Sequence, residues 1–385
     1  MKPKILIFIN TLGFGGAERV VSQLLVHLQK DFEIHLALLT KIIDYDIPKD
    51  VKIFDLKQPF NENTIFTFLK LPVLALKLKR YCKKHNITKC VSFLNRPCYI
   101  SGFMRSWYSF KDKILMCERT HQSTLFKNDT FFYKTVSSFL IKFAYNKADL
   151  VLTNSVVMAE DLVENFDIKV PIKVIYNPID VSAVKLKSLD EPDYFFEPEI
   201  FHFISVGGFR KEKNYSLLLE AFAIIKELQV KLIFIGGGDL ENELKQKAQQ
   251  LNLSDKVVFA GFDANPYKYM VRADCLVLSS YVEGFPNVIL EALACGKTVI
   301  STDCKSGPRE ILAPHSALNF QILKGFENAE YGIITSVKSP ADLAMAMKEV
   351  YENKELRNKY ENKASKRAED FDVIKIKDQF KNVFQ

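Results

Sequence analysis

The stretch CLVLSSYVEGFPNVILEALACGKTVIS, residues 275–301, predicts a strand, a helix and a second strand in immediate succession. Residues 275–278 and 298–301 are short apolar runs typical of buried parallel strands. Between them, Pro286 suits the first helical turn and Gly296 the C′ position that follows a helix. A βαβ unit of this length indicates an α/β fold, in which ligands bind at the carboxyl ends of the strands.

The loop 283–287 is expected at that edge of the sheet. Free backbone N–H groups around residues 285–288 and the positive end of the helix dipole favour an anion such as a diphosphate. Glu283 in the loop and Glu291 on the second helical turn can accept hydrogen bonds from vicinal hydroxyls. The alternative is that both acids only complement the helix dipole.

This Glu-x7-Glu pattern with Gly-Phe-Pro-Asn inside it resembles the donor-sugar signature of GT4-type glycosyltransferases. The resemblance implies an α/β GT-B fold, two Rossmann-like domains facing a central cleft, and hexose transfer with retention of configuration. It also implies that the first Glu contacts the hexose, the loop amides contact hexose and diphosphate, and the second Glu holds the ribose. The donor-binding candidates from this stretch are Glu283, which is also a catalytic candidate, Gly284, Phe285, Pro286, Asn287, Val288 and Glu291.

The chain of 385 residues, 48% of them hydrophobic, is long enough for two domains. We expect an N-terminal acceptor-binding domain over residues 1–180 and a nucleotide-sugar-binding domain over 200–369. The acidic, Pro-containing segment 181–199 between them is predicted to be a linker. A C-terminal helix at about 370–385 is expected to cross back onto the first domain.

Seven cysteines without a C-x-x-C pair, and no signal peptide, favour a reducing, cytoplasmic location. No apolar run approaches the roughly 18 residues of a spanning helix. The sequence therefore predicts a protein that does not cross a membrane.

Basic residues concentrate in the first half of the chain. Residues 1–180 contain 26 Lys and Arg against 17 Asp and Glu, and residues 63–111 contain ten basic residues and no acid. A helix expected over 65–85, bent or interrupted at Pro72, can lie on an anionic bilayer or can be an ordinary surface helix. Its candidate membrane or acceptor contacts are Lys70, Lys77, Lys79, Arg80, Lys83 and Lys84. A second aromatic and basic helix over 130–145 is expected to belong to the core rather than to act as the alternative, a membrane anchor.

Other strand ends of the first half add candidates. Gly15 and Gly16 follow the first strand, where glycine lets the backbone approach a ligand, although Glu18 excludes the dinucleotide fingerprint G-x-G-x-x-G. Arg96 and Arg119 follow two further strands and are candidate acceptor contacts. His121 lies where GT4-like enzymes often place a histidine near the transferred sugar, and is the second catalytic candidate. The alternative is a histidine in a surface loop.

In the second half, Gly207–Asn214 reads GGFRKEKN, a basic cluster before a helix that suits a diphosphate. The family shows Val-Gly-Arg followed five residues later by Lys. Lys213 matches that Lys, whereas Gly208 occupies the Arg position and Arg210 comes two residues later. Both Arg210 and Lys213 are donor-binding candidates, and whether Arg210 replaces the family's Arg stays open.

No metal site is expected. Asp44-Tyr-Asp46 and Asp370-Phe-Asp372 fit the D-x-D pattern of metal-dependent transferases, but neither follows a sheet strand in the right context. No cofactor is expected either, since the donor, which we expect to be UDP-linked, is a substrate.

Several bacterial GT4-like enzymes that elongate lipid-linked glycans, including N-acetylgalactosamine transferases of the N-glycan pathway, look similar in the basic region and in Ser306–Glu310. We therefore expect transfer of a hexose, specifically an N-acetylhexosamine, to a polyprenyl-diphosphate-linked saccharide. The enzyme would associate peripherally with the inner face of the cell membrane and would not bind nucleic acid. The alternatives are a transferase of lipopolysaccharide or capsule synthesis, a GT-B sugar-nucleotide epimerase, and a noncatalytic nucleotide-sugar or nucleic-acid binder.

Overall fold

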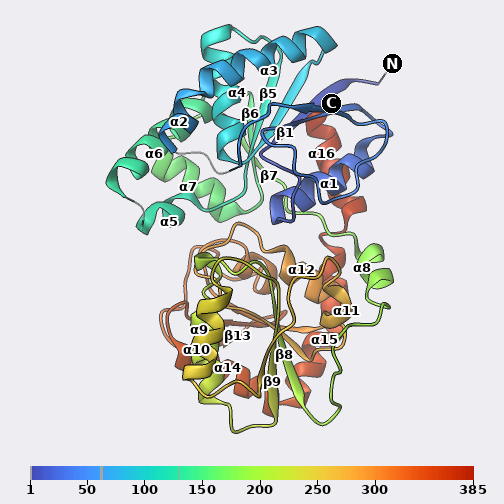
Figure 1. Ribbon diagram of the computed structural model, residues 1–385, viewed down its shortest axis with the longest axis vertical. Coiled ribbons are helices and arrows are strands. Elements are labelled where there is room, and N and C mark those ends of the chain that lie inside the picture. Colours follow the sequence, from blue (N-terminus) through green and yellow to red (C-terminus); the bar gives the residue numbers. More distant parts are fainter. Residues whose placement is uncertain (1, 61–63, 129) are drawn as a thin grey trace. The chain divides into compact units, whose positions relative to one another are not determined.

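The computed structural model describes residues 2–60, 64–128 and 130–385. The chain divides into two compact units (Figure 1). Unit 1 comprises Met1–Pro178 together with Val373–Gln385, and unit 2 comprises Ile179–Asp372.

Unit 1 is built on a parallel sheet in the order β3-β2-β1-β4-β5-β6-β7. Side chains of β1 alternate between the two faces, so Ile5 and Ile7 join one hydrophobic cluster while Leu6 and Phe8 join another. The strand order reverses between β1 and β4, the position at which open α/β sheets bind ligands. The strands are β1 (Lys4–Ile9), β2 (Glu33–Leu38), β3 (Lys52–Asp55), β4 (Lys89–Phe93), β5 (Lys113–Glu118), β6 (Leu150–Thr153) and β7 (Ile172–Val174).

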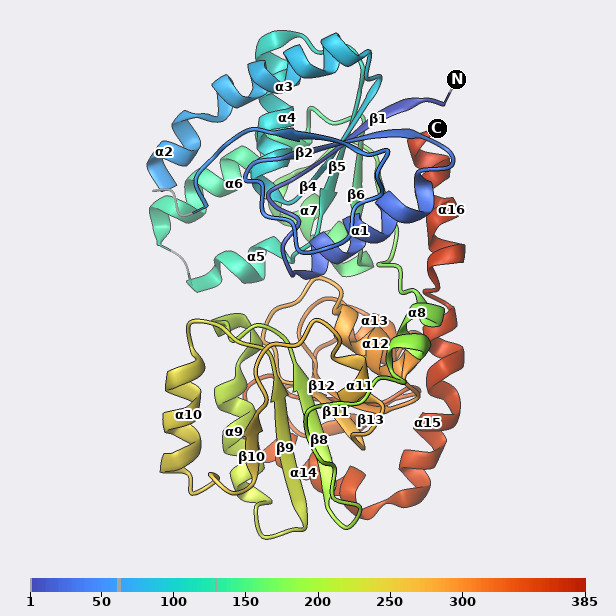
Figure 2. The same ribbon diagram turned by 45° about the vertical axis from the view of Figure 1, so that its right-hand side comes forward.

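The helices of unit 1 cover both faces of this sheet (Figure 2). Helices α3, α4 and α6 contribute to the cluster with Leu6, and α1 and α16 contribute to the cluster with Ile5. The helices are α1 (Gly16–Leu28), α2 (Thr64–Leu69), α3 (Leu71–His85), α4 (Asn95–Tyr108), α5 (Gln122–Leu125), the 3₁₀ turn η1 (Phe126–Asn128), α6 (Phe131–Tyr145), α7 (Val156–Phe166) and α16 (Val373–Phe384).

The predicted helix 65–85 is interrupted, as Pro72 indicated. Helix α2 ends at Leu69 and α3 starts at Leu71, with Pro72 in the first turn of α3. This is the position that proline tolerates, because the N–H groups there have no intrahelical acceptor.

Helix α6, which the sequence placed in the core, has two faces. Ile141 and Tyr145 are fully buried, whereas Phe131 and Phe139 are 84% and 67% exposed. The prediction of a core helix was therefore wrong for the outer face of α6, because aromatic residues occur all around this helix.

Unit 2 is built on a sheet in the order β10-β9-β8-β11-β12-β14-β13, parallel except for the antiparallel pair β13 and β14. Its strands are β8 (Phe201–Val206), β9 (Val230–Ile235), β10 (Val257–Phe259), β11 (Cys275–Leu278), β12 (Thr298–Thr302), β13 (Phe326–Asn328) and β14 (Ile333–Thr335). Its helices are α8 (Val181–Lys187), the 3₁₀ turn η2 (Lys211–Lys213), α9 (Tyr215–Ile224), α10 (Glu241–Gln250), α11 (Tyr267–Met270), α12 (Asn287–Ala294), α13 (Pro308–Leu312), α14 (Pro340–Glu352) and α15 (Lys354–Glu369).

Residues 275–302 form β11, α12 and β12, and β11 pairs in parallel with β12. Gly296 has φ +72°, the left-handed conformation expected at C′. Pro286 lies at the N-cap of α12, one position before the predicted first turn.

The predicted linker 181–199 is not an extended connection. It begins with α8, whose first turn is capped by Asp180 Oδ1 accepting from Ala183 N at 2.8 Å. Helix α8 packs on α11 and α12, and Arg272 Nη2 lies 2.7 Å from Glu191 Oε1. The segment therefore belongs to unit 2, because a capped helix and an ion pair hold its first half against that unit.

The C-terminal helix α16 belongs to unit 1. Its Ile376, Phe380 and Phe384 are buried in the same cluster as helix α1. Lys89 Nζ donates to Phe384 O at 2.6 Å, and Lys381 pairs with Asp31 at 2.5 Å.

Within residues 2–60, 64–128 and 130–385, the helices are all too short or too polar to span a bilayer.

Candidate functional site

Two strand-to-helix connections of unit 2 meet at the carboxyl ends of β8 and β11. Lys213 Nζ lies 2.6 Å from Glu283 Oε1, and the same oxygen accepts from Ser280 Oγ at 2.7 Å. Ser279 Oγ donates to Lys213 O at 2.8 Å, which ties the two connections together through the backbone. The structure thus brings together two predicted donor-site residues that are 70 positions apart in the sequence.

A third segment fixes the loop that carries Glu283. Ser306 Oγ donates to Glu283 O at 2.6 Å. The next residue, Gly307, has φ +89°, and a Cβ there would lie 2.5 Å from Pro286 Cδ and 2.8 Å from Gly284 O. Glycine is therefore required at 307, both for its conformation and for the close approach to the loop.

The loop leads into helix α12, and its residues are largely buried. Pro286 is the N-cap and Asn287 the first helical residue. The side chains of Phe285 and Val288 are buried and anchor the start of the helix. Glu291, one turn further, is 3% exposed.

The guanidinium of Arg210 lies close to Gly208. A Cβ at Gly208 would be 3.5 Å from Arg210 Nε. Arg210 is exposed and precedes the turn η2 that carries Lys213. The side chain of Arg210 therefore lies near Gly208, the residue at which the resemblance expected an arginine.

In unit 1, Gly15 is the N-cap of α1 with an extended backbone, and Gly16 is the first helical residue. A Cβ at Gly15 would lie 2.2 Å from Glu18 Oε2, so the glycine makes room for this carboxylate. Asp44 Oδ2 accepts from Phe14 N at 3.3 Å, which gives the first acid of one D-x-D pattern a role in fixing the loop.

Glu118 at the carboxyl end of β5 organises the turn that follows. Its Oε1 accepts from Arg119 N at 2.7 Å, Thr120 N at 3.0 Å and Gln122 Nε2 at 2.9 Å. Its Oε2 accepts from Tyr145 OH at 2.8 Å. Burial raises the pKa of this carboxyl above its ordinary value of 4.5.

His121 is held in the same turn and is 2% exposed, which excludes the alternative of a surface-loop histidine. Its Nδ1 lies 3.0 Å from Thr124 Oγ1 and 3.6 Å from Asp161 Oδ2. Asp161 on α7 is buried and also accepts from Ser123 N at 3.1 Å and Asn165 Nδ2 at 2.9 Å. The ring nitrogen Nδ1 of His121 therefore contacts side chains of its own unit.

Arg119 points into unit 1 and is 7% exposed. Its Nη1 donates to Asn177 Oδ1 at 2.9 Å, and its guanidinium carbon lies 4.9 Å from the ring centre of Phe93. Burial lowers the pKa of Arg119. Its side chain supports the strand ends from within, whereas Arg96 lies in the first turn of α4.

The lysines and arginine of α3 occupy two different surfaces. Lys77, Arg80 and Lys84 are exposed and share one side of the helix by their spacing. Lys79 and Lys83, one turn apart, lie on another side, and Lys79 Nζ donates to Tyr108 O. Lys70 lies between α2 and α3.

Several residues that fix the site carried no sequence signal. The hydroxyls of Ser279, Ser280 and Ser306 hold the Glu283 loop, and Asp161 contacts His121 from a helix 40 positions away. Serine is common in loops, and Asp161 lies inside an amphipathic helix, so only the tertiary contacts reveal these roles.

Both halves of the chain match known families. Residues 14–183 match Glycosyltransferase Family 4, and residues 190–367 match Glycosyl transferases group 1. The chain is 40% identical over 379 residues to the N-acetylgalactosamine-N,N'-diacetylbacillosaminyl-diphospho-undecaprenol 4-alpha-N-acetylgalactosaminyltransferase of Campylobacter jejuni, with 97% of each chain covered. A second Campylobacter jejuni protein, GalNAc-alpha-(1->4)-GalNAc-alpha-(1->3)-diNAcBac-PP-undecaprenol alpha-1,4-N-acetyl-D-galactosaminyltransferase, is 25% identical over 387 residues, covering 98% of this chain and 97% of that one.

Solved structures share the fold over nearly the whole chain. Sucrose-phosphate synthase from Thermosynechococcus elongatus aligns with a TM-score of 0.82 at 16% identity, covering 100% of this chain and 98% of that one. Anabaena HepE, solved in complex with UDP, aligns with a TM-score of 0.73 at 20% identity, covering 99% of each chain.

Proposed function

The chain belongs to the GT4-type glycosyltransferases of the GT-B fold, hexosyltransferases built from two Rossmann-like units, and from this premise we propose which sugar it moves and onto what. The donor is a UDP-linked N-acetylhexosamine, and the acceptor is a saccharide carried on a polyprenyl diphosphate. Transfer proceeds with retention of configuration. The observation that carries this proposal is the 40% identity, over 97% of both chains, to a relative whose name specifies an N-acetylgalactosaminyl transfer to a diphospho-undecaprenol-linked acceptor.

The donor diphosphate is assigned to the cationic end of unit 2. Lys213 and Arg210 supply the positive charge, and the N–H groups at residues 285–288 supply hydrogen bonds at the start of α12. The proximity of Arg210 Nε to Gly208 supports Arg210 as the replacement for the family's diphosphate arginine. Glu291 is assigned to the ribose hydroxyls.

The chemical step separates charge between sugar and diphosphate. Positive charge develops on the hexose ring, where the Glu283 carboxylate is assigned, and negative charge develops on the leaving UDP, where Lys213 is assigned. The 2.6 Å contact between Lys213 Nζ and Glu283 Oε1 fixes the positions of these two side chains relative to each other. Because these charges come from side chains and backbone, we propose that no metal ion and no cofactor take part.

His121 is assigned to the transferred sugar from unit 1. The contacts of Thr124 and Asp161 with Nδ1 fix the orientation of the imidazole ring. Gly15, Gly16 and Arg96 are assigned to the donor or acceptor at neighbouring strand ends.

Peripheral association with the inner membrane face rests on α2, α3 and α6. Phe66, Leu69 and Val73 are 58%, 68% and 57% exposed and are followed on α3 by exposed cations. The rings of Phe68 and Tyr133 lie 6.5 Å apart, which brings α2 beside α6 with its exposed Phe131 and Phe139. Large exposed apolar side chains beside basic ones fit an anionic bilayer.

The membrane assignment is tested with Lys77→Gln/Arg80→Gln/Lys84→Gln. Lys79 and Lys83 are kept because they lie on another side of α3. Lys79 Nζ also donates to Tyr108 O at the end of α4, so its loss would destabilise the fold. The triple variant should lose binding to anionic vesicles and transfer slowly to a lipid-linked acceptor, with unchanged donor affinity. A variant with wild-type vesicle binding would contradict the docking role.

The activity itself is tested by a donor screen that measures released nucleotide, with and without a polyprenyl-diphosphate-linked saccharide. We expect release from UDP-N-acetylhexosamines that depends on this acceptor. Full turnover with a lipopolysaccharide or capsule acceptor would instead identify that branch of the family. Epimerisation of the donor alone, or binding of donor or RNA without turnover, would refute the proposal.

A further inference from the structure

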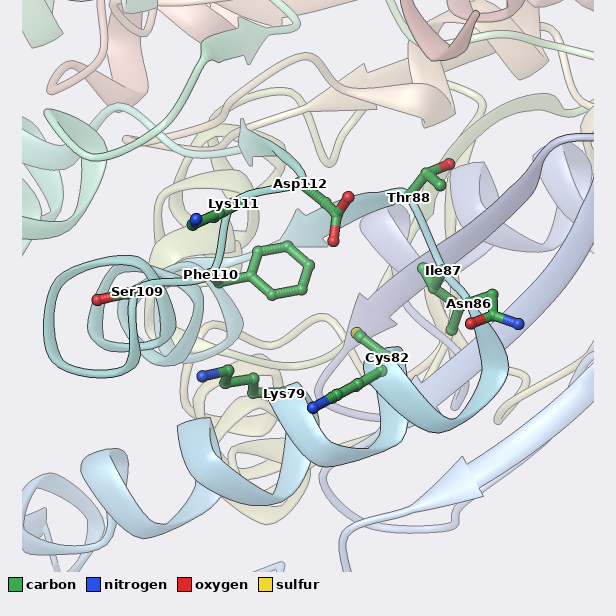
Figure 3. A pocket seen from close by; sticks show the side chains of 10 residues that line it. Lys79, Cys82, Asn86, Ile87, Thr88, Ser109, Phe110, Lys111 and Asp112 are labelled. Atoms are coloured by element: carbon green, nitrogen blue, oxygen red, sulfur yellow. The ribbon is translucent and has the colours of Figure 1, made fainter.

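A cavity of about 310 Å³ lies at the amino edge of the sheet in unit 1 (Figure 3). Its wall is formed by the last turns of α3, by Ile87 and Thr88 directly before β4, and by residues 109–112 directly before β5. The residues assigned above to donor and acceptor follow the carboxyl ends of the strands. The cavity is therefore at the opposite edge of the sheet from these residues, although Lys79 and Lys83 in its wall are also candidate membrane or acceptor contacts of α3.

The rim of the cavity carries three ammonium groups from two separate segments. Lys79 and Lys83 come from α3, and Lys111 comes from the connection between α4 and β5. Lys79 is used by the fold, because its Nζ donates to Tyr108 O at the end of α4. Within the described part of the chain, neither Lys83 nor Lys111 has an ion pair with a carboxylate.

Among the described residues that line the cavity, Asp112 is the one acidic residue, and it forms no ion pair with the lysines there. Its carboxylate points toward the side of Thr88, whereas the ammonium groups of Lys79 and Lys111 point the opposite way (Figure 3). Within this described lining, Lys83 and Lys111 therefore carry the positive charge that no carboxylate pairs.

The floor of the cavity is apolar. Cys82, Ile87 and Phe110 are 0%, 2% and 5% exposed. This floor gives a bound anion an apolar wall on one side, while Lys83 and Lys111 are exposed. Ser109 adds a hydroxyl donor at the rim, whereas Thr88 Oγ1 donates to Lys4 O at 3.4 Å.

We propose that this cavity binds a phosphate group, either as free phosphate or as the headgroup of an anionic lipid. A phosphate offers several acceptor oxygens to the ammonium groups and to the Ser109 hydroxyl gathered here. The volume is at the lower end of small-molecule sites, roughly 300–1,000 Å³, which leaves room for a short group attached to the phosphate. The two sources share this chemistry and are separated by experiment.

The first test measures binding of inorganic phosphate to the full chain by ³¹P NMR line broadening. We compare wild type with Lys83→Gln/Lys111→Gln and with Lys49→Gln/Lys57→Gln, an equal charge change at two exposed lysines of unit 1 outside the cavity. The cavity variant should bind phosphate at least about tenfold more weakly, because each lost charged hydrogen bond is worth about that factor. The matched variant should bind like wild type. Absence of phosphate binding by wild type, or equal weakening in both variants, would overturn the proposal.

The second test separates the two sources with phosphatidylcholine vesicles that contain either phosphatidic acid, a phosphate monoester, or phosphatidylglycerol. If the cavity takes a lipid headgroup, Lys83→Gln/Lys111→Gln should selectively weaken binding to the phosphatidic acid vesicles. If it takes free phosphate, the variant should lose phosphate binding while binding both vesicles like wild type. If Lys83→Gln/Lys111→Gln weakens binding to both kinds of vesicle equally, and Lys49→Gln/Lys57→Gln does the same, net charge alone explains the effect. That result would refute a specific phosphate site.

Discussion

Replacing Lys213 by Met should separate the charge of this residue from its packing. The variant keeps the aliphatic stem but removes the ammonium that lies 2.6 Å from Glu283 Oε1. The side chains of Lys213 and Glu283 are 23% and 13% exposed, so water only partly compensates for the loss. Ser280 Oγ still donates to Glu283 at 2.7 Å, which limits the structural damage.

Two magnitudes follow from this geometry. A charged hydrogen bond is worth about 1.5–3 kcal/mol, and partial exposure and the remaining Ser280 contact reduce the expected loss of stability to about 1 kcal/mol. Removing one preorganised group that stabilises transition-state charge costs about 3–4 kcal/mol, or roughly 10²–10³ in kcat. The loss of activity should therefore greatly exceed the loss of stability.

The assay follows release of nucleotide at saturating donor and acceptor, with the melting temperature measured in parallel. Lys211→Met is the matched control, because Lys211 is exposed in the same 3₁₀ turn. It should keep kcat within a few-fold of wild type, a change of less than about 1 kcal/mol. A Lys213→Met enzyme with near wild-type kcat, or a Lys211→Met enzyme equally impaired, would refute the assignment of Lys213 to the leaving diphosphate.

Four further outcomes are expected. Glu291→Ala should raise the KM for the donor while Glu283→Ala should mainly lower kcat, and wild-type kinetics in both would contradict the donor assignment. EDTA should leave activity unchanged, and restoration by a metal of activity lost on chelation would refute a metal-independent reaction. Asp161→Asn should lower kcat, since Asp161 Oδ2 lies 3.6 Å from His121 Nδ1 and helps to orient the ring; wild-type kcat in this variant would contradict a positioning role for Asp161. Glu118→Gln should gain stability relative to wild type as the pH rises above 4.5. Burial raises the pKa of Glu118 in the native state, so the wild-type protein loses stability as this carboxyl ionises. Urea unfolding that gives the same difference in free energy of unfolding between the two proteins at acid and neutral pH would contradict this.

The sequence predicted those parts of the protein in which local pattern and position along the chain are sufficient. Buried strands such as β11 and β12 are continuous apolar runs, and the helix between them is bounded by Pro286 and Gly296. Parallel strands place their carboxyl ends together, so the nearness of the segments carrying Lys213 and Glu283 was predictable from topology.

The failures concern the direction in which side chains point and what they meet. Arg119 follows a strand as expected, but it turns inward onto Phe93, and a sequence cannot show which side of a strand end holds an aromatic ring. The basic residues of α3 form one group in the sequence, whereas Lys79 caps a neighbouring helix. Segment 181–199 lacked periodicity, but Asp180 starts a helix that the surface of unit 2 stabilises.

The return of α16 to unit 1 makes the order of synthesis important. Ile376, Phe380 and Phe384 complete a hydrophobic cluster whose other buried members come from residues 5–175, yet nearly all of unit 2 is translated between the two sets. A nascent chain that has emerged only through residue 178 exposes the apolar surface that α16 later covers, while unit 2 can fold before synthesis ends. The N-terminal unit therefore begins first and finishes last, and any fragment that stops before Val373 should need a chaperone or aggregate, even though every residue of its sheet is present.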